Sequence, residues 1–481
     1  MATPLTSLNL NKGPVHFIGI SGTGMSGLAH YLASSETKVS GSDLQLIPSI
    51  KHYLKKSGIK LFPNHRASNI NSDCKLVIKS AAIPGSNPEI IRANKYRIPI
   101  IKYAQLLGLL MRRAGYGIAV SGAHGKTTTS SLMAHILHQA GKKPSFVIGG
   151  VPKDFQSSAR PGRSPYFVVE ACEYDRSFHQ LPAIIRIVNN VEPDHLDYYS
   201  NFANVVKAFR QFCLMPPARL DDGYRSGGPA DRLVIANIDS PGVRRCLKGL
   251  KIRVATFGST ARAEWHFKPL PGNNGFRVWH KRQLYGDFRL GIPGHHNFYN
   301  ALACIIAADR LGIAKPVIRK ALAGFSGVAR RFDVIASGPA VRGRIIIDDY
   351  GHHPTEITST LQTARAAYPG RRIFCVFQPH QYSRTRLFLD QFAQALQAAD
   401  AVLVPPIYSA RDNARERALI SSADLVNAIN KISPRARYFD NFADIAGYLK
   451  GNTIPGDVII TLGAGDVWEI GPMLKQELKK G

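Results

Sequence analysis

Residues 116–140 read YGIAVSGAHGKTTTSSLMAHILHQA, and this stretch decides the fold. An apolar run typical of a buried strand leads through a glycine-rich loop at 121–129 into a sequence typical of a helix. The GKT triplet at 125–127 matches the core of a phosphate loop, in which backbone amides and a lysine hold phosphates and a hydroxyl ligates Mg²⁺. Val120 stands where such loops usually have their first glycine, and Gly122 comes later. We therefore predict an ATP site on a shortened phosphate loop.

A second glycine-rich loop, GISGTGMSG at 19–27, lies near the start of the chain. It follows the apolar run VHFIGI at 15–20 and opens a helix-like stretch at 26–35. Its glycines have the G-x-G-x-x-G spacing, and Asp43 ends the next predicted strand about 20 residues on, where an acid can hold a ribose. Bare backbone N–H groups at a helix start can approach a pyrophosphate closely. The loop predicts a dinucleotide or nucleotide-sugar site and does not by itself separate NAD from a UDP-linked sugar.

Strands and helices alternate along the whole chain, which predicts an α/β fold with parallel sheets. The alternation restarts twice, so we expect three units in series, at 1–113, 114–328 and 329–481. Residues 262–290 are β-rich, and the polar, glycine-rich stretch 219–232 predicts a surface loop. The other expected strands are 38–43, 75–83, 97–103, 166–171, 183–191, 344–350, 372–380, 401–408 and 457–465, and the other expected helices are 104–113 and 297–312.

Composition bounds the function. The 481 residues include 62 Lys and Arg against 33 Asp and Glu, a net charge of +29, but the excess is spread along the chain rather than gathered in a basic tail or helix. This distribution favours a solvated surface that attracts anionic substrates, with no specific nucleic-acid partner. No apolar run reaches the roughly 18–20 residues of a membrane span, the start lacks a signal-peptide pattern, and the six cysteines form no CxxC pair. We expect a cytoplasmic protein, monomer or homodimer, without a membrane partner.

Acidic and imidazole side chains follow two further predicted strands. Glu170 opens EACEYDRSF, and the stretch 189–199 delivers Asp194, His195 and Asp197. Sites of α/β proteins lie at the carboxyl ends of strands, so these groups can hold Mg²⁺ beside the phosphate loop. For each residue, the alternative is a hydrogen-bonded loop or capping role. This alternative would be preferred for His195 taken singly, whereas together with the GKT loop the metal role is favoured.

Three later stretches offer polar groups with open alternatives. Asn297 and Asn300 lie three residues apart at a helix start, where their amides can read an adenine edge or cap the helix. The arginine pair at 330–331 can bridge phosphate oxygens or form a surface ion pair. The histidines at 352–353 lack the i, i+4 spacing of a helical metal pair, so we expect polar contacts there. Loops at 377–386 and 462–471 are expected to hold a second substrate.

The two phosphate-binding loops together restrict the chemistry. A helicase or motor ATPase does not need the first loop, and a dehydrogenase does not need the second. The combination indicates that ATP activates a substrate carried on a nucleotide.

The motifs resemble the Mur ligase family over essentially the whole chain. The resemblance rests on HFIGISGTGMSGLA, SGAHGKTTT, EACEYDRSF, NNVEPDHLDYY, PGHHNFYNALA, GVARRFD, DDYGHHPTEI, FQPHQYSRT and GAGDVW, in the family's order. It implies a three-domain architecture: a Rossmann-like domain for a UDP-sugar, a central ATP-binding domain, and a Rossmann-like domain for an amino acid. The implied activity is ATP-dependent joining of L-alanine to the lactyl carboxylate of UDP-N-acetylmuramate through an acyl phosphate, in peptidoglycan precursor synthesis, with Mg²⁺.

The resemblance also assigns residues. It places catalysis on Lys126, Glu170, His195 and Arg331, and the metal on Thr127, Glu170 and His195. It places the UDP-sugar on Gly22, Gly24 and Asp43. It places ATP on Gly122, Ala123, His124, Gly125, Lys126, Thr127, Thr128, Asn297, Asn300, Arg331 and Asp349.

The chain departs from the family pattern at several positions. Ala123 replaces the usual Thr of the phosphate loop, and EACEYDRSF stands where many relatives read EADESDGSF, which introduces Cys172, Tyr174 and Arg176. Arg210 falls where related ligases carry a carbamylated lysine, a modification that arginine does not take.

Three alternatives remain at this point. A ligase of the same family that attaches a murein tripeptide would keep both loops and differ in its amino-acid pocket. A folate polyglutamylating ligase would not need the first loop. A basic ATPase that acts on nucleic acid is suggested by the charge, but no aromatic-interleaved basic stripe supports it.

Overall fold

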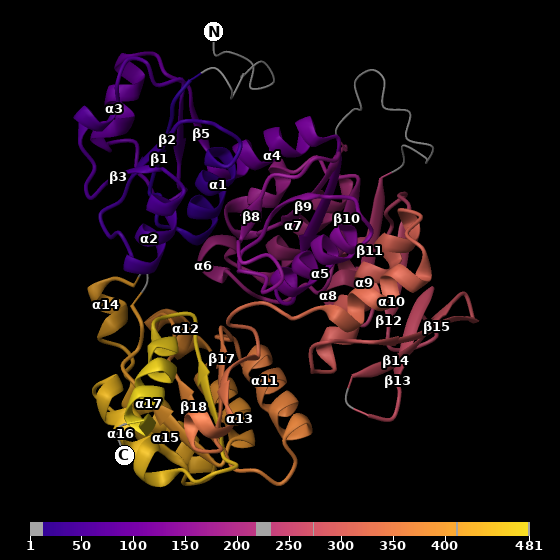
Figure 1. Ribbon diagram of the computed structural model, residues 1–481, viewed down its shortest axis with the longest axis vertical. Coiled ribbons are helices and arrows are strands. Elements are labelled where there is room, and N and C mark those ends of the chain that lie inside the picture. The colour runs from indigo at the N-terminus through magenta and orange to yellow at the C-terminus, as the bar shows by residue number, and fades with distance from the viewer. Residues whose placement is uncertain (1–12, 218–231, 273, 410–411, 480–481) are drawn as a thin grey trace. The chain divides into compact units, whose positions relative to one another are not determined.

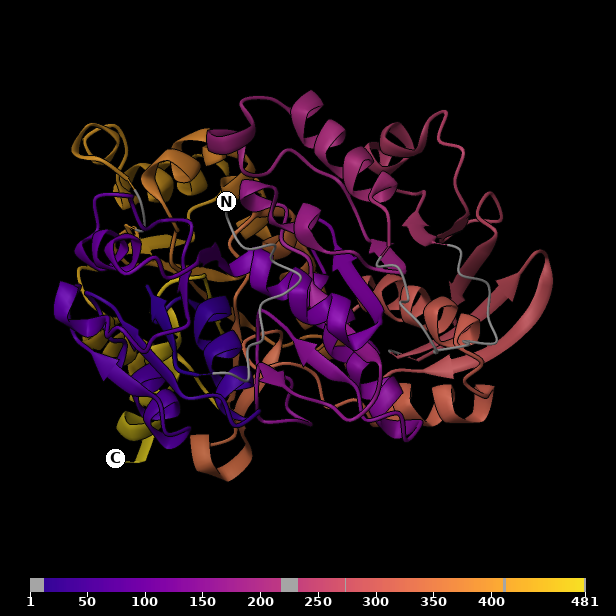
Figure 2. The same cartoon turned by 90° about the horizontal axis from the view of Figure 1, so that it is seen from above.

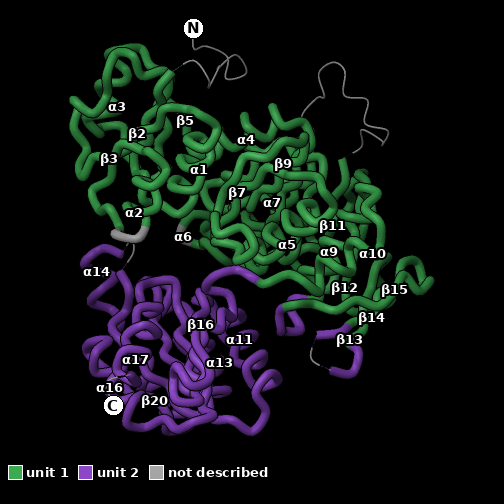
Figure 3. Tube along the Cα trace, in the orientation of Figure 1, with its two compact units in different colours: residues 1–269, 276–291, 298–326 green, residues 270–275, 292–297, 327–481 purple. Residues whose placement is uncertain are grey.

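The computed structural model describes residues 13–217, 232–272, 274–409 and 412–479 (Figure 1). Its α/β architecture, with three separate sheets, confirms the expected fold class. By compactness the chain divides into two units (Figure 3). The first comprises Met1–Pro269, Phe276–Gly291 and Phe298–Ser326, and the second comprises Leu270–Gly275, Ile292–Asn297 and Gly327–Gly481.

The first sheet has five parallel strands in the order β3-β2-β1-β4-β5. Its central strands, β1 and β4, are short apolar runs that are almost entirely buried, because a parallel sheet is covered by helices on its faces. Its strands are β1 (Val15–Ile18), β2 (Val39–Ser42), β3 (Lys60–Phe62), β4 (Leu76–Lys79) and β5 (Ile100–Lys102), with helices α1 (Thr23–Ala33), α2 (Pro48–Lys56), η2 (Ala67–Asn69), α3 (Pro88–Lys95) and α4 (Tyr103–Ala114).

The second sheet has ten strands in the order β15-β14-β13-β12-β11-β10-β6-β9-β7-β8. Its centre is parallel, whereas β13 and β14 pair antiparallel, and β15 forms one edge (Figure 2). Its strands are β6 (Tyr116–Ser121), β7 (Ser145–Val147), β8 (Ala159–Arg160), β9 (Tyr166–Glu170), β10 (Ile185–Val188), β11 (Leu233–Asn237), β12 (Val254–Gly258), β13 (Trp265–Pro269), β14 (Gly275–His280) and β15 (Gln283–Arg289). The helices along this part of the chain are α5 (Lys126–Gln139), η3 (Tyr174–Gln180), α6 (Leu196–Tyr199), α7 (Phe202–Leu214), α8 (Pro241–Leu247), α9 (His296–Arg310) and α10 (Lys315–Gly324).

The third sheet lies in the second unit and has the order β16-β17-β21-β18-β19-β20. It is parallel apart from the antiparallel pair β16–β17. Its strands are β16 (Asp333–Ser337), β17 (Ile345–Asp349), β18 (Ile373–Phe377), β19 (Ala401–Val404), β20 (Ala436–Tyr438) and β21 (Val458–Leu462). Its helices are η4 (Gly338–Val341), α11 (Pro354–Ala367), α12 (Tyr382–Leu387), α13 (Leu389–Ala395), η5 (Leu396–Ala398), α14 (Ala414–Arg417), α15 (Ser422–Ile432), α16 (Phe442–Asn452), η6 (Val467–Glu469) and α17 (Ile470–Lys479).

Each strand and helix that the sequence predicted by its residue range is present, with ends shifted by a few residues. Seven strands of the structure were not predicted, namely β3, β7, β8, β11, β12, β16 and β20, although β11 is a short apolar run. The predicted surface loop 219–232 lies outside the described residues except for Arg232. No helix of the described residues is long and apolar enough to cross a membrane.

A charged cluster is buried in the first sheet. The Glu89 carboxylate is fully buried, and its oxygens lie 3.2 Å from His16 Nε2 and 2.9 Å from His65 Nδ1. Ser42 and Asn69 each donate a hydrogen bond of 2.7 Å to it. Burial alone would raise the pKa of Glu89, but the hydrogen bonds from His16, Ser42 and Asn69 outweigh burial and lower it.

We expect Glu89→Gln to destabilise the first sheet by about 1–3 kcal/mol at neutral pH, because an amide cannot accept on both sides. A folded pKa below the unfolded value means that the wild-type stabilisation is present at neutral pH and is lost as the pH falls through the folded pKa. Native-state hydrogen exchange of the β1 amides, at neutral and acid pH, measures both effects. The exposed Asp73→Asn is the control. Equal pH dependence in wild type and Glu89→Gln would contradict the assignment.

Candidate functional site: the phosphate loop and its surroundings

The loop between β6 and α5 adopts a backbone conformation that requires glycine. Gly122 has φ 141° and Gly125 has φ 78°, both in the region that side chains rarely adopt. At Gly125 a Cβ atom would also lie 2.5 Å from Asn300 Oδ1. Gly125 is the N-cap of α5, so the loop leads into the positive end of a 14-residue helix. The shortened motif therefore folds with the strand–loop–helix geometry that is typical of anion-binding loops.

Lys126 is held by its own loop and by one carboxylate. Its Nζ donates hydrogen bonds to the carbonyl oxygens of Gly122 (2.6 Å) and Ala123 (3.1 Å), and to Glu173 Oε1 (3.0 Å). Burial by itself would lower the pKa of Lys126, but the charge of Glu173 outweighs burial and raises it above the ordinary value. The lysine is therefore a fixed positive charge at the loop.

Glu173 also lies beside His195 and Asp194. The His195 Nε2 atom is 3.8 Å from Glu173 Oε1 and 3.8 Å from Asp194 Oδ2. One ligand atom from each of the three residues falls within 4.8 Å of the others. The second oxygen of Glu173, Oε2, is buried and has no hydrogen-bond partner among the described residues. Two carboxylates, an imidazole and an unsatisfied buried oxygen fit a divalent cation such as Mg²⁺.

Glu173 was not among the residues that the sequence analysis selected. Glu170, the predicted metal ligand, ends β9 and accepts a 2.7 Å hydrogen bond from the Gly149 amide. Glu173 comes three residues later, directly before η3, and its carboxylate contacts Lys126. The same motif contains both glutamates, and only the structure shows that the second one reaches Lys126.

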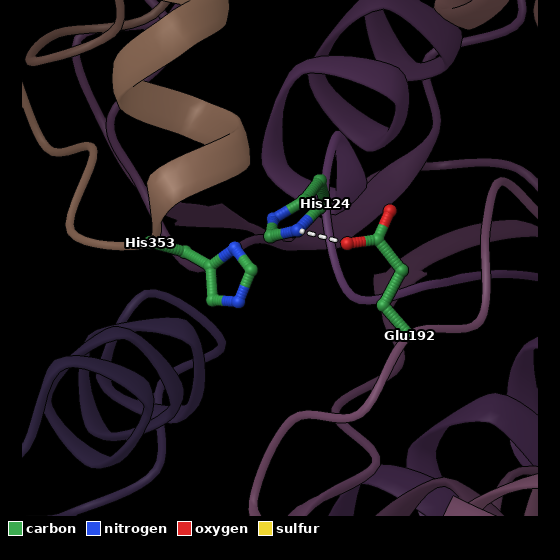
Figure 4. Close-up of side chains that lie close together, drawn as sticks. All are labelled: His124, Glu192 and His353. Carbon is green, nitrogen blue, oxygen red and sulfur yellow. Dashed lines mark hydrogen bonds and ion pairs between the residues drawn. The ribbon is translucent and has the colours of Figure 1, made fainter. Parts of the chain in front are cut away.

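His124 connects the phosphate loop to the segment that follows β10. The His124 amide donates to Asn190 Oδ1 at 2.8 Å, and His124 Nε2 lies 3.2 Å from Glu192 Oε2 (Figure 4). These contacts tie the loop to the segment that follows β10. Thr127 and Thr128 are buried in the first turn of α5. The described part of the chain excludes the Asp197 side chain.

The first glycine loop is organised by Asp43 and Tyr103. Asp43 Oδ2 accepts a 2.8 Å hydrogen bond from the Ser21 amide, so this carboxylate holds the loop itself. A Cβ atom on Gly24 would lie 2.9 Å from the ring of Tyr103. A Cβ atom on Gly22 would make only ordinary van der Waals contacts, so no atom of the described residues crowds the backbone at this position. The nucleotide-sugar role of Gly22, Gly24 and Asp43 stays a prediction.

Comparison with known families decides the relationship. Residues 14–114 match the pattern described as Mur ligase family, catalytic domain, residues 120–308 match the Mur ligase middle domain, and residues 330–465 match the Mur ligase, glutamate ligase domain. This chain belongs to the Mur ligase family.

Individual relatives resemble this Mur ligase in sequence or structure over nearly its full length. The UDP-N-acetylmuramate–L-alanine ligase of Caldanaerobacter subterraneus is 40% identical over 471 residues, which are 97% of this chain and 98% of that protein. The crystal structure of UDP-N-acetylmuramate-alanine ligase from Thermotoga maritima has a TM-score of 0.81 at 27% identity, covering 97% and 99% of the two chains. The MurF ligase of Thermotoga maritima, solved in complex with ADP, has a TM-score of 0.60 at 16% identity, covering 93% and 97%. The three-domain Mur ligase architecture expected from the sequence is confirmed.

In this Mur ligase the two asparagines of α9 make protein contacts. Asn300 Oδ1 accepts a 3.0 Å hydrogen bond from the Thr129 hydroxyl, which places this buried amide against the phosphate loop and α5. The Asn297 amide donates to the Pro293 carbonyl oxygen. Their contact with adenine stays a prediction.

The second unit holds Arg331 and Asp349. Arg330 is fixed by Asp348 at 3.1 Å and by the Gly463 carbonyl at 2.7 Å, whereas Arg331 lies 3.8 Å from Glu356. The Asp349 carboxylate accepts 2.7 Å hydrogen bonds from the amides of Phe332 and Gly351, and burial raises its pKa to about 6. Asp349 thus fixes the backbone next to Arg331. Their roles toward the nucleotide stay predictions.

Two further sequence expectations concern residues outside the loop. Arg210, on α7, donates hydrogen bonds to the carbonyl oxygens of Cys246 (3.1 Å) and Lys248 (2.6 Å), so it anchors the end of α8. His353 accepts a hydrogen bond from the Thr355 amide and caps α11, which is a polar contact of the kind expected for 352–353.

We expect Gly125→Ala to weaken ADP binding at least about tenfold, because a methyl group there requires Asn300 to move as well as a strained backbone. Gly141→Ala is a matched control, since Gly141 has φ 73° and nothing within 4 Å of its Cβ position. Both variants pay the same backbone strain, about 1–2 kcal/mol, and only the first meets Asn300. Titration with a fluorescent ADP measures the difference, and equal affinities would contradict the role given to Asn300.

Proposed function

We propose that this Mur ligase joins L-alanine to the lactyl carboxylate of UDP-N-acetylmuramate at the expense of ATP, in the synthesis of the peptidoglycan precursor. The observation that carries the proposal is 40% identity, over 97% of this chain, to a UDP-N-acetylmuramate–L-alanine ligase. Further ligases of that name, from Clostridium acetobutylicum and Alkaliphilus metalliredigens, are 38% and 37% identical over 95% and 96% of this chain.

Three domains divide the substrates in this proposal. Residues 1–113 hold the UDP-sugar at the loop of Gly22, Gly24 and Asp43. Residues 114–328 hold ATP, and residues 329–481 hold L-alanine and contribute Arg331 and Asp349. The boundaries are supported by the separate sheets and by family matches that begin and end close to them. The protein acts in the cytoplasm, where ATP is available, as a monomer or homodimer.

The reaction needs activation because a carboxylate is a poor electrophile. The lactyl carboxylate oxygen attacks the γ-phosphorus of ATP, the bond to the β–γ bridging oxygen breaks, and ADP leaves. The neutral amine of L-alanine then attacks the acyl carbon, phosphate leaves with the bonding electrons, and the amine loses a proton as the amide forms. Positioning and charge neutralisation supply most of the catalysis in such phosphoryl transfers.

Lys126 and the start of α5 are the main phosphate-binding groups. The raised pKa keeps the Lys126 ammonium charged, so it can neutralise the β- and γ-phosphates. The N-terminal end of α5 places the positive end of the helix dipole beside the same phosphates. Glu173 holds the lysine in place at 3.0 Å.

Glu173, Asp194 and His195 are the residues that would hold Mg²⁺, together with Thr127 and Glu170 as the family resemblance suggests. The proposal is supported by the three ligand atoms within 4.8 Å and by the unsatisfied Glu173 Oε2. When bound, Mg²⁺ supplies charge neutralisation of the phosphate oxygens during transfer.

The test is ADP formation from ATP and UDP-N-acetylmuramate with each of several acceptors. We expect turnover with L-alanine and none with L-Ala-γ-D-Glu-meso-diaminopimelate, and the comparison also ranks L-serine and glycine. Turnover with the tripeptide alone would assign the chain to the murein-tripeptide ligases instead. ATP hydrolysis stimulated by DNA or RNA, without any acceptor, would point to the nucleic-acid ATPase.

We expect Lys126→Ala to lower kcat by at least about 10³-fold, because the buried charge that meets the transferred phosphoryl group is lost. The exposed Lys142→Ala is the control and should leave kcat unchanged. Steady-state kinetics with all three substrates saturating measures both, and retained turnover in Lys126→Ala would remove the ATP site from this loop.

A further inference from the structure

Tyr174 begins the turn η3, directly after Glu173, and its ring meets the imidazole of His195. The ring centroids are 5.1 Å apart and the planes are inclined by 63°, an edge-to-face arrangement. A second tyrosine, Tyr198, lies 5.6 Å from Tyr174 between ring centroids. His195 is thus packed against the first of two adjoining aromatic rings.

An imidazole that ligates a metal is ordinarily oriented by a hydrogen bond from its other ring nitrogen to a carboxylate or carbonyl oxygen. Among the described residues, no side chain or backbone group forms a hydrogen bond with a ring nitrogen of His195. Its nearest carboxylates, Glu173 and Asp194, are both 3.8 Å from Nε2, beyond a direct hydrogen bond. The ring contact with Tyr174 can restrict the orientation of the imidazole in place of such a hydrogen bond.

The backbone on both sides of this contact is constrained. His195 itself has φ 54° and ψ 40°, a left-handed conformation that is unfavourable for a residue with a Cβ atom. The Tyr199 hydroxyl donates a hydrogen bond to the Glu173 carbonyl oxygen, and this joins α6 to the residue before Tyr174. The Asp175 carboxylate is ion-paired with Lys102 at 2.8 Å. The three consecutive residues 173–175 therefore each contact a different residue, namely Tyr199, His195 and Lys102.

We propose that Tyr174 is a positioning residue, which fixes the His195 imidazole with Nε2 directed at the carboxylates of Glu173 and Asp194. The inference rests on the proposed function, since it gives His195 the metal. It assigns the contact to the aromatic ring rather than to the phenol hydroxyl. Tyr174→Phe should therefore preserve it, and Tyr174→Ser, which restores the residue of the family pattern, should abolish it.

The experiment measures Mn²⁺ affinity in the presence of ADP, without turnover, from the electron paramagnetic resonance signal of free Mn²⁺. An edge-to-face aromatic pair contributes a factor of about 3–10 to an equilibrium. We expect Tyr174→Ser to raise the Mn²⁺ Kd about 3–10-fold and Tyr174→Phe to leave it unchanged. In turnover, Tyr174→Ser should raise the Mg²⁺ concentration needed for half-maximal rate and leave the KM for L-alanine unchanged.

A double-mutant cycle with His195→Ala decides whether Tyr174 acts through His195. In the His195→Ala background, Tyr174→Ser should have no further effect on Mn²⁺ affinity. An equal loss in both backgrounds overturns the proposal, and so does a loss in Tyr174→Phe equal to that in Tyr174→Ser. Absence of Mn²⁺ binding in the wild type also overturns it.

The Mn²⁺ measurement contains neither the UDP-sugar nor an amino acid. Failure of the substrate assignment would therefore appear as absent turnover with unchanged Mn²⁺ results. Failure of the Tyr174 assignment would appear as unchanged Mn²⁺ affinity in Tyr174→Ser with normal turnover on L-alanine.

Discussion

The ion pair between Lys126 and Glu173 is the constraint on which the candidate site depends. A buried ammonium in a phosphate loop is costly unless a carboxylate accompanies it, and here Glu173 lies 3.0 Å away. The pair forms only if the loop after β6 and the turn after β9 meet, which the adjacency of these parallel strands ensures. Strand β10, on the other side of β6, brings His195 to the same edge. The order of three central strands thus assembles the site.

Most of the fold could be predicted from the sequence because its strands are short, continuous apolar runs buried on both faces. Runs such as VHFI at 15–18 and IIIDD at 345–349 are entirely buried. The helix starts were equally visible where glycine loops precede them. Seven strands were not predicted, and most of them are too short or too polar to stand out as apolar runs, such as β3 at 60–62 and β20 at 436–438. The division by compactness into two units rather than three reflects packing between residues distant in sequence, which periodicity does not report.

The site was predicted less completely, for reasons that lie in the backbone. Lys126 and His195 were found from motif and strand position. Glu173 was missed because strand ends alone favour Glu170. The residues that follow, Asp175 and Arg176, adopt left-handed conformations, which a sequence does not predict for residues other than glycine. Asn300 was expected to contact adenine or to cap its helix, and in the structure its Oδ1 accepts a hydrogen bond from Thr129 of α5. The adenine contact stays a prediction. Side-chain amides on a helix have many partners in reach, and spacing does not choose among them.

The contact between Gly24 and Tyr103 links two positions that are far apart in the sequence. The absence of a side chain at position 24 serves the packing of a tyrosine from α4, since a Cβ atom there would lie 2.9 Å from the ring. A nucleotide-binding fingerprint is usually attributed to its ligand alone. Here one of its glycines is also tied to a residue 79 positions further along the chain. A shorter side chain at residue 103 would therefore remove the contact that bars a Cβ atom at residue 24.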